Sequence, residues 1–453
     1  MSIQAPLPDR RKTTTFTILV ALSAATAGLI YGYDVGVINS SLVFIRKDLD
    51  LGALPTEILA SALFWGCVAG APLGGWIADR FGRHKALLLS GILFAAADLG
   101  MSVCGAFWQL LAARLVAGVG VGAALVVAPM YIAEIAPAHS RGRLVTVNQL
   151  AVVSGILIGF ICNFSLARVT GGNWHILFLV GATPAVVMCL SLIRTPESPR
   201  WLYQRGDRER AVKVLGRIET APEAERTLQQ LSMSTGERKG SYRELIGPAL
   251  RKPLVLAVML AIIQQATGVN TVLYYGSILF AENTGASAVQ AIGMNILVGT
   301  VNLAFTILGL LMIDRLGRRS LLLIATAGMG ICLAAFVVML RIVPDQPFIL
   351  LIPILAYVGS FAFGLGTAVW VCLSELFPSH LRGRAMSIAT MMLWISVSCV
   401  AATFLSLVKA FGISSVFLGY SAICFASFVY ILLSLPETRN RTLEEIETFW
   451  SRG

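Results

Sequence analysis

Long uninterrupted runs of apolar residues dominate the chain, and short polar gaps separate them. A helix needs about 20 apolar residues to cross the hydrocarbon core of a bilayer. Twelve runs reach this length, at residues 16–38, 57–78, 86–105, 108–131, 146–166, 174–193, 253–278, 287–312, 320–341, 348–373, 384–408 and 414–435. Because apolar residues do not alternate with polar ones, a closed β-barrel is excluded. The pattern predicts an all-α membrane protein with twelve transmembrane helices.

The composition and the distribution of charge support this interpretation. Hydrophobic residues make up 57% of the chain and charged residues 13%, against about 25% charged residues in a soluble domain. A soluble enzyme, a disordered regulator and a fibrous repeat are thereby excluded. Of 35 Lys and Arg residues, 29 lie in the segments on the side of the N-terminus and five in the opposite gaps. This asymmetry predicts that both termini are cytoplasmic, and it indicates a topology signal rather than binding of nucleic acid.

Three motifs occur twice along the chain, in the same order. They are 79–83 and 314–318 (Asp-Arg-X-Gly-Arg), 134–143 and 375–384 (with Glu, Pro, Arg, Gly and Arg at identical spacing), and 196–198 and 436–438 (Pro-Glu-Ser or Pro-Glu-Thr). Six spans in each half give the halves one orientation. The repeat therefore predicts two six-helix bundles related by an axis along the membrane normal, with a substrate site between them near mid-membrane.

The spans and the polar segments divide the chain into five parts. These are a cytoplasmic N-terminal segment (1–15), a six-helix bundle (16–193), a cytoplasmic helical linker (194–252), a second six-helix bundle (253–435) and a cytoplasmic C-terminal tail (436–453). In the linker, apolar residues recur at helical spacing, which predicts short amphipathic helices. A passive connection and a latch between the halves both remain open.

Other residue patterns give no sign of an enzyme or of a metal site. The eight Cys residues lie in apolar runs without metal-ligand spacing and are interpreted as small buried hydrophobes. The four His residues are scattered at span ends, so no metal and no cofactor is expected. Gly118, Gly120 and Gly122 lack the strand–turn–helix context of a nucleotide site and are interpreted as helix packing.

Ionisable residues within the spans are the first candidates for function, because a charge in the hydrocarbon needs a partner or a wet cavity. Asp34 lies in the second half of the first span, Arg114 opens the fourth, and Asp98 lies well inside the third. An Asp beside a buried Arg stays ionised, and the same Asp without that partner is driven toward neutrality. Asp34 and Arg114 are therefore candidates for a proton switch. A fixed ion pair between the two spans is the alternative. For Asp98 two alternatives remain open: an accessory acid in a water path, or a position near the outer interface.

Side-chain amides inside the spans are the second group of candidates. Gln264, Gln265 and Asn270 surround Thr267-Gly268, where a local break in the seventh span is expected. Amides donate and accept hydrogen bonds, as sugar hydroxyls do, and an aromatic ring matches the apolar face of a sugar. Further candidates of these types are Gln149, Tyr274, Asn302, Trp370 and Trp394. Amide pairs that join helices are the alternative.

Acids and arginines lie together at the cytoplasmic span ends. They are Asp79, Arg83, Glu134, Arg141, Arg143 and Glu197 in the first half, and Asp314, Arg318, Glu375, Arg382, Arg384 and Glu437 in the second. They would serve the charge asymmetry in any case. The functional hypothesis is a network of salt bridges between the bundles that forms only when the cytoplasmic side is closed. Neutralising Glu134 or Glu375 is then expected to favour the inward-open state.

Eight strings in order resemble the sugar porter family of the major facilitator superfamily, in particular bacterial sugar–proton symporters such as the xylose–proton symporter. They are GYDVGVIN (32–39), DRFGRH (79–84), PMYIAEIAPAHSRGR (129–143), PESPRWL (196–202), QQATGVNTVLYY (264–275), DRLGRR (314–319), ELFPSHLRGRAMS (375–387) and PETRNRTLEEI (436–446). The resemblance spans residues 16–447. It implies a proton site at Asp34 with Arg114 as partner, because facilitators that need no ion carry Asn there. The resemblance also supports a role of the cytoplasmic salt bridges between the bundles as a gate.

The resemblance also implies a sugar site. The family's sugar-binding positions fall on Gln149, Gln264, Gln265, Asn270, Asn302, Trp370 and Trp394. Two positions depart from relatives. Leu393 stands where the xylose symporter has Gln and animal glucose facilitators have Asn, and Ala362 stands where those facilitators have Glu. The missing amide at position 393 leaves the identity of the sugar open and favours a deoxy sugar, a polyol or a lower affinity.

Together these features predict a proton-coupled symporter of a monosaccharide, a hexose or a pentose, that works by alternating access. The expected partners are the sugar, protons and the lipid bilayer, with no obligate protein partner. Short outer loops suggest a bacterial inner membrane. A proton-independent facilitator or exchanger of sugars or polyols is the first alternative, and a non-transporting sugar sensor is the second.

Overall fold

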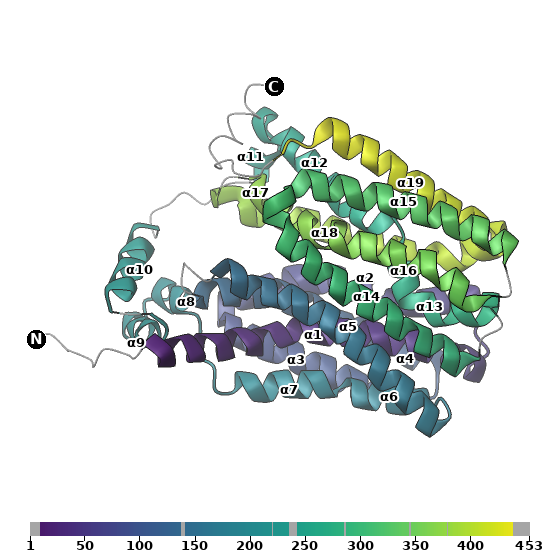
Figure 1. Ribbon diagram of the computed structural model, residues 1–453. Coiled ribbons are helices and arrows are strands. Elements are labelled where there is room, and N and C mark those ends of the chain that lie inside the picture. Colours follow the sequence, from purple (N-terminus) through teal and green to yellow (C-terminus); the bar gives the residue numbers. More distant parts are fainter. Residues whose placement is uncertain are drawn as a thin grey trace, which may run out of the picture.

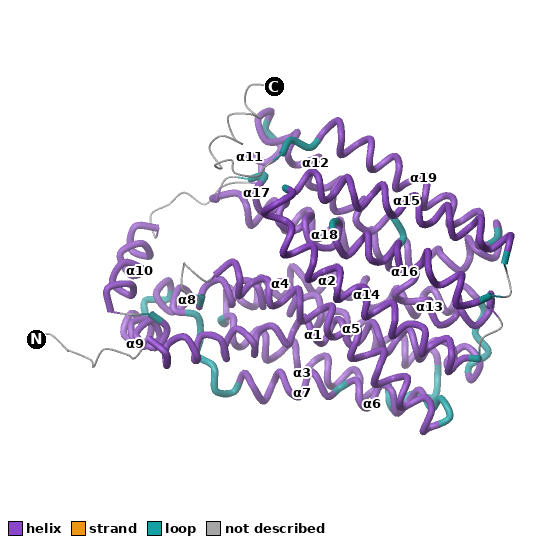
Figure 2. Tube along the Cα trace, in the orientation of Figure 1, coloured by secondary structure: helices purple, strands orange, loops and turns teal. Residues whose placement is uncertain are grey.

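The computed structural model describes residues 10–136, 141–219, 221–234, 242–284, 287–343, 346–377 and 379–437. Helices and short loops make up this part of the chain, and no strand occurs within it (Figure 2). The helices before the linker are α1 (Arg10–Asp48), α2 (Ala53–Phe81), α3 (Arg83–Met101), α4 (Phe107–Ile135), α5 (Arg141–Thr170), α6 (Trp174–Gly181) and α7 (Thr183–Leu192). We call them the first half.

Four shorter helices connect this half to the second one. The connecting helices are α8 (Pro199–Gln204), α9 (Arg208–Ile218), α10 (Ala221–Ser234) and α11 (Tyr242–Ile246). The second half consists of α12 (Pro248–Ala266), α13 (Val269–Thr284), α14 (Ala288–Leu316), α15 (Arg318–Ile342), α16 (Pro347–Phe363), α17 (Leu365–Glu375), α18 (Ser379–Phe411) and α19 (Ile413–Ser434). The amphipathic pattern of the connecting segment thus gives short helices, as expected.

Twelve spans are long and apolar enough to cross a membrane, which confirms the predicted number. The first span extends to Asp48, ten residues beyond its predicted end. Hydropathy falls at Asn39, Ser40 and Ser41, but these side chains are buried against other helices rather than at a helix end. A protein contact has therefore replaced lipid on this face of α1.

Three spans are each built from two helices. The break between α12 and α13 falls at Thr267 and Gly268, where it was expected, and Gly268 has a φ of +86°, which favours glycine. A second break falls at Ala182, between α6 and α7, and a third at Gly364, between α16 and α17. The last two breaks were not expected, because the runs there are mostly apolar and have no group of amides like the one around Gly268.

Within the first half, glycines bring helix backbones into direct contact. A Cβ atom at Gly32 of α1 would lie 1.9 Å from the carbonyl oxygen of Val152 in α5, and one at Gly66 of α2 would lie 2.3 Å from the carbonyl oxygen of Leu115 in α4. Gly118 packs against α2 in the same way. Small residues allow such close packing in membrane helices, so the interpretation of the glycine string in α4 as a packing motif agrees with the structure.

The two halves lie side by side and pack mainly through α2 with α18, α5 with α14, and α1 with α13 (Figure 1). The repeated motifs lie at the end of the molecule that carries α8, α9 and α17, and we call this the motif end. The loop from α1 to α2 and the ends of α13 and α18 lie at the other end, which we call the opposite end. The ribbons of the two halves diverge toward the motif end (Figure 1).

Candidate functional site

A buried ion pair joins α1 and α4 in the first half. Nη1 of Arg114 donates to Oδ1 of Asp34 at 2.6 Å, and the two side chains are 0% and 1% exposed. The remaining Oδ2 of Asp34, and Nε and Nη2 of Arg114, have no hydrogen-bond partner among the described residues. The structure thus brings together the two residues that the sequence paired, and a single hydrogen bond holds them.

Asp98 of α3 is a second buried acid in the same half. Its side chain is 2% exposed, and its Oδ1 has no hydrogen-bond partner in the described part of the chain. The other oxygen faces Gly181 at the break between α6 and α7, where an added Cβ would lie 2.8 Å away. Asp98 therefore faces the interior of the first half from the last turn of α3, and both alternatives, an acid in a water path and a position near the outer interface, stay predictions.

The amides of the seventh span form one hydrogen-bonded group at the break between α12 and α13. Nε2 of Gln265 donates to Oε1 of Gln264 at 3.4 Å, and Nδ2 of Asn270 donates to Oε1 of Gln265. Nε2 of Gln264 donates to the carbonyl oxygen of Leu365, at the start of α17, at 2.8 Å. The unexpected break at Gly364 thus lies next to this group and provides its backbone acceptor.

An aromatic cluster joins the two halves near these amides. The rings of Tyr31 and Phe64, from the first half, contact those of Trp394 and Tyr274, from the second, with centroid distances of 4.9 to 6.3 Å. The hydroxyls of Tyr31 and Tyr274 lie 2.9 Å apart. Nε1 of Trp394 is buried without a hydrogen-bond partner among the described residues. Trp394 and Tyr274 were predicted, whereas Tyr31 and Phe64 were missed.

Three predicted site residues lie apart from this network of contacts. Asn302 of α14 is buried, and Gln149 of α5 and Trp370 of α17 are half-buried. Within the described residues, no hydrogen bond or ring contact ties them to the amide group or to the aromatic cluster. Tyr31 lies one helical turn before Asp34 on α1, so the ion pair and the aromatic cluster share one helix.

At the motif end of the first half, Arg83 organises a charge cluster. Its Nε lies 3.0 Å from Oε2 of Glu134, and its Nη2 lies 3.2 Å from Oδ1 of Asp79. Oε1 of Glu197 accepts a hydrogen bond from the backbone N–H of Arg83 at 2.9 Å. Gly82 lies beside this carboxylate, and its φ of +107° favours glycine.

The second half repeats this arrangement. Nη2 of Arg318 lies 3.0 Å from Oε1 of Glu375, and Nη1 of Arg318 lies 3.1 Å from Oδ1 of Asp314. The carboxylate of Glu437 accepts from the backbone N–H groups of Arg318 and Arg319 at 3.1 and 3.2 Å. Both clusters join residues of one half. Salt bridges between the bundles therefore stay a prediction for a state in which this end is closed.

Four predicted gate residues add little to this picture. The side chains of Arg141 and Arg143 lie outside the described side chains. Arg382 and Arg384 lie in the first two turns of α18 and are half-buried. The predicted tail from residue 438 onward also lies outside the described residues.

At the opposite end, polar contacts tie the halves together. Nη1 of Arg46 donates to Oε1 of Glu282 at 2.7 Å. Nδ2 of Asn39 donates to the carbonyl oxygen of Leu273 at 2.7 Å, and Oγ of Ser277 donates to Oδ1 of Asn39. The state described is therefore joined at the opposite end.

Comparison with known proteins identifies the family. The family model described as "Sugar (and other) transporter" matches residues 20–450. The D-xylose-proton symporter of Escherichia coli is 34% identical over 481 residues, covering 96% of each chain. The major myo-inositol transporter of Bacillus subtilis is 32% identical over 445 residues, covering 96% of this chain and 94% of the relative. The inward-open structure of the E. coli xylose transporter superposes with a TM-score of 0.82 at 30% identity, covering 95% of this chain and 99% of that one.

These matches cover almost the whole chain and agree with the twelve spans. The family consists of transporters, so the expectation that the chain is not an enzyme is confirmed. The chain is a multi-pass membrane protein and belongs to the sugar porter family of the major facilitator superfamily.

Proposed function

We propose that this chain moves a monosaccharide, a hexose or a pentose, together with a proton across a bacterial inner membrane by alternating access. The termini and the motif end face the cytoplasm in this proposal, because the Lys and Arg residues concentrate in the segments on that side. The similarity to a D-xylose-proton symporter supports the sugar and the proton as substrates.

The buried pair of Asp34 and Arg114 is the observation that carries proton coupling. A guanidinium does not lose its proton in a protein, so Asp34 is the group whose charge changes. Because one hydrogen bond of 2.6 Å joins the pair, protonation of Asp34 removes the charge of the carboxylate to which Arg114 donates. The helix α1 is then free to move relative to α4, and Tyr31 transmits this movement to Tyr274 of the other half.

The sugar binds between the halves, beside the amide group and the aromatic cluster. Gln264, Gln265 and Asn270 offer donors and acceptors that match sugar hydroxyls, and the Trp394 ring offers an apolar face. The unpartnered Nε1 of Trp394 supports this proposal, because a buried donor is satisfied in almost every native structure. We assign Gln149, Tyr274, Asn302 and Trp370 to the same site.

The gates lie at the two ends of the molecule. In the state described, contacts such as Arg46 with Glu282 hold the opposite end together, and the site is proposed to open toward the motif end, where the ribbons of the two halves diverge (Figure 1). In the other state, the acids and arginines of the motif end pair between the bundles. The residues proposed for this gate are Asp79, Arg83, Glu134, Arg141, Arg143, Glu197, Asp314, Arg318, Glu375, Arg382, Arg384 and Glu437.

Replacement of Asp34 by Asn tests the coupling. We expect Asp34→Asn to exchange labelled sugar down a gradient and to lose uphill accumulation and the dependence of uptake on the pH gradient. One pH unit is worth about 1.4 kcal/mol per proton and 100 mV about 2.3 kcal/mol, enough together for accumulation of about a hundredfold or more. Uphill uptake equal to that of the original chain would remove Asp34 from the mechanism.

A proton-independent carrier of polyols is the second candidate. Leu393 places a buried apolar side chain, 4% exposed, where an amide was expected from the family, and a myo-inositol transporter is among the relatives. The Asp34–Arg114 pair would then be purely structural. Addition of sugar or polyol to de-energised vesicles separates the two candidates, because only a symporter makes the external medium more alkaline.

A further inference from the structure

Glu57 is a buried carboxylate that bridges the two halves at the opposite end. It lies in the second turn of α2 and is 0% exposed. Its Oε1 accepts from the backbone N–H of Ser406, in α18, at 2.7 Å, and its Oε2 accepts from the hydroxyl of Ser406 at 2.5 Å. Both oxygens therefore depend on one residue of the other half.

No cation pairs with Glu57 among the described residues, although a carboxylate is rarely buried without one. The charged or titratable groups near it are Tyr275 of α13, whose hydroxyl donates to the carbonyl oxygen of Ala401, and Lys409 of α18, one turn after Ser406. A carboxylate with two hydrogen bonds from Ser406 is stable only while α18 stays in place, because burial without hydrogen bonds is costly.

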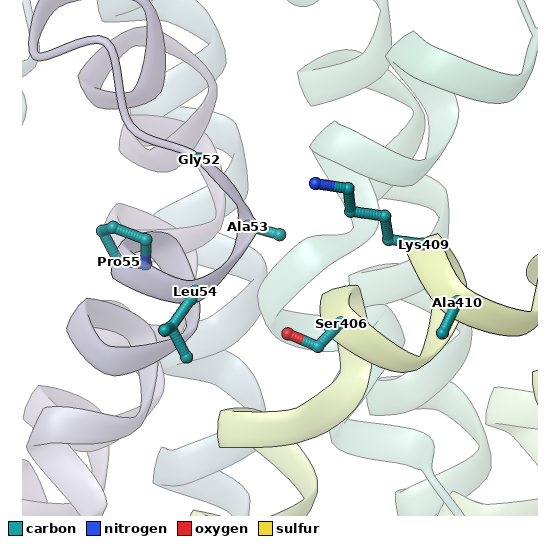
Figure 3. A pocket seen from close by; sticks show the side chains of 7 residues that line it. All are labelled: Gly52, Ala53, Leu54, Pro55, Ser406, Lys409 and Ala410. Atoms are coloured by element: carbon teal, nitrogen blue, oxygen red, sulfur yellow. The ribbon is translucent and has the colours of Figure 1, made fainter.

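The surrounding geometry places this contact at an entrance. A pocket of about 540 Å³ is lined by the start of α2 and the end of α18, and the side chain of Ser406 points from α18 toward α2 (Figure 3). Gly52, Ala53, Leu54, Pro55, Ser406, Lys409 and Ala410 line this pocket. Glu57, Ser61 and Phe64 follow one face of α2, and Phe64 contacts Trp394 of α18. The face that begins at Glu57 thus leads from the entrance to the aromatic cluster.

We propose that Glu57 and Ser406 form a latch that keeps the opposite end closed. The latch opens when α2 and α18 separate and water replaces Ser406 around the carboxylate. Its strength sets the balance between the two states of the carrier. The inference rests on the alternating access of the proposed function and requires neither proton coupling nor a particular sugar.

The latch is a set of hydrogen bonds, so charge and hydrogen bonding can be separated by substitution. In Glu57→Gln, the amide oxygen accepts from the N–H of Ser406 and the amide nitrogen donates to its hydroxyl, which keeps both contacts. In Glu57→Leu both contacts are lost at similar side-chain volume. Ser406→Ala removes the hydroxyl and keeps the backbone donor.

The test is labelling of a reporter cysteine, Ser61→Cys, with a membrane-impermeant thiol reagent added at the opposite end, without sugar and without a pH gradient. Ser61 is 2% exposed in the closed state. The four native cysteines that are not fully buried, Cys162, Cys189, Cys332 and Cys399, are replaced first. The matched control is Glu282→Gln, which breaks the exposed pair with Arg46 at the same end.

We expect Glu57→Leu to label about tenfold faster or more, since a hydrogen bond to a charged group is worth about that factor. Ser406→Ala gives a smaller increase, and Glu57→Gln and Glu282→Gln stay within about threefold of the parent. Equal melting temperatures of the Glu57 variants show that both are folded. If Glu57→Leu does not fold, Ser406→Ala, which is also expected to label faster than the parent, still tests the latch.

Two outcomes overturn the inference in different ways. Measurable labelling of the parent with no increase in Glu57→Leu, or an increase in Glu57→Gln as large as that of a disrupted latch, rules out the latch and leaves alternating access intact. Absence of labelling in every variant, while sugar exchange continues, rules out opening at this end and with it the alternating access that we propose.

Discussion

Gln265 holds a central position in the amide group, and its removal gives the sharpest test of the sugar site. Its side chain is 6% exposed, and it donates to Gln264 and accepts from Asn270. Gln265→Ala removes both contacts and leaves the Nδ2 of Asn270 without the acceptor it has in this state. The same change removes a donor and an acceptor for sugar hydroxyls.

The size of the effect follows from the burial of the site. Loss of a partner at a desolvated position costs about 1–3 kcal/mol, and each 1.4 kcal/mol is a factor of about ten in Kd. We therefore expect Gln265→Ala to raise the Kd by between about fivefold and about 150-fold. Because the amide is neutral, the change in Kd should be the same at different values of pH.

Binding of tritiated sugar to the purified carrier measures this Kd directly. Asn163→Ala is the matched control, because Asn163 of α5 is a fully buried amide that donates to the carbonyl oxygen of Gly159 in its own helix. We expect its Kd to stay within about twofold of the parent. A Kd for Gln265→Ala that is equally unchanged would place the sugar away from the break between α12 and α13.

Two further predictions concern packing and the contact between the halves. Gly32→Ala should lower the melting temperature by an amount equivalent to about 1–3 kcal/mol, since its methyl group would lie 1.9 Å from the carbonyl oxygen of Val152. Gly75→Ala is the control, because its methyl group enters open space and should leave the melting temperature unchanged or raised. Equal melting temperatures of the two variants would refute direct backbone packing. Tyr31→Phe removes the 2.9 Å hydrogen bond to the hydroxyl of Tyr274. Labelling of the reporter cysteine Ser61→Cys should become about fivefold faster, as expected for the loss of about 1 kcal/mol. Unchanged labelling would show that this hydrogen bond does not hold the halves together.

Much of the fold could be predicted because a membrane imposes simple rules on the sequence. Twelve apolar runs give twelve spans, and the break at Gly268 was visible because polar residues surround it. The break at Gly364 was not visible, because its neighbours are apolar and hydropathy does not report a change in the direction of the helix. The end of α1 was placed too early, because Asn39 and its neighbours resemble a helix end in composition while they contact another helix in space.

Some residues of the candidate site could likewise be predicted from the sequence, and others could not. Asp34 and Arg114 could be found from sequence because charges within a span are rare and demand an explanation. Phe64 could not be found in this way, because a phenylalanine is ordinary in a membrane helix, and only its distance to Trp394 gives it meaning. The contact of Glu57 with Ser406 joins residues 349 positions apart, and Glu57 stood at the edge of a predicted span, where a charge is expected.

Helix contacts within the first half and contacts between the halves involve different kinds of atoms, and this difference has a mechanical consequence. Inside the first half, Gly32 and Gly66 meet the main chain of a neighbouring helix, whereas Gly293 of α14 meets the ring of Phe164 of α5 across the boundary between the halves. Main-chain atoms in a helix cannot swing aside, but a ring can turn about its side-chain bonds. The first bundle is thus stiff where its helices meet, whereas the contact at Gly293 between the bundles can adjust by rotation of a side chain. Evolution can retune that contact one side chain at a time without rebuilding either bundle.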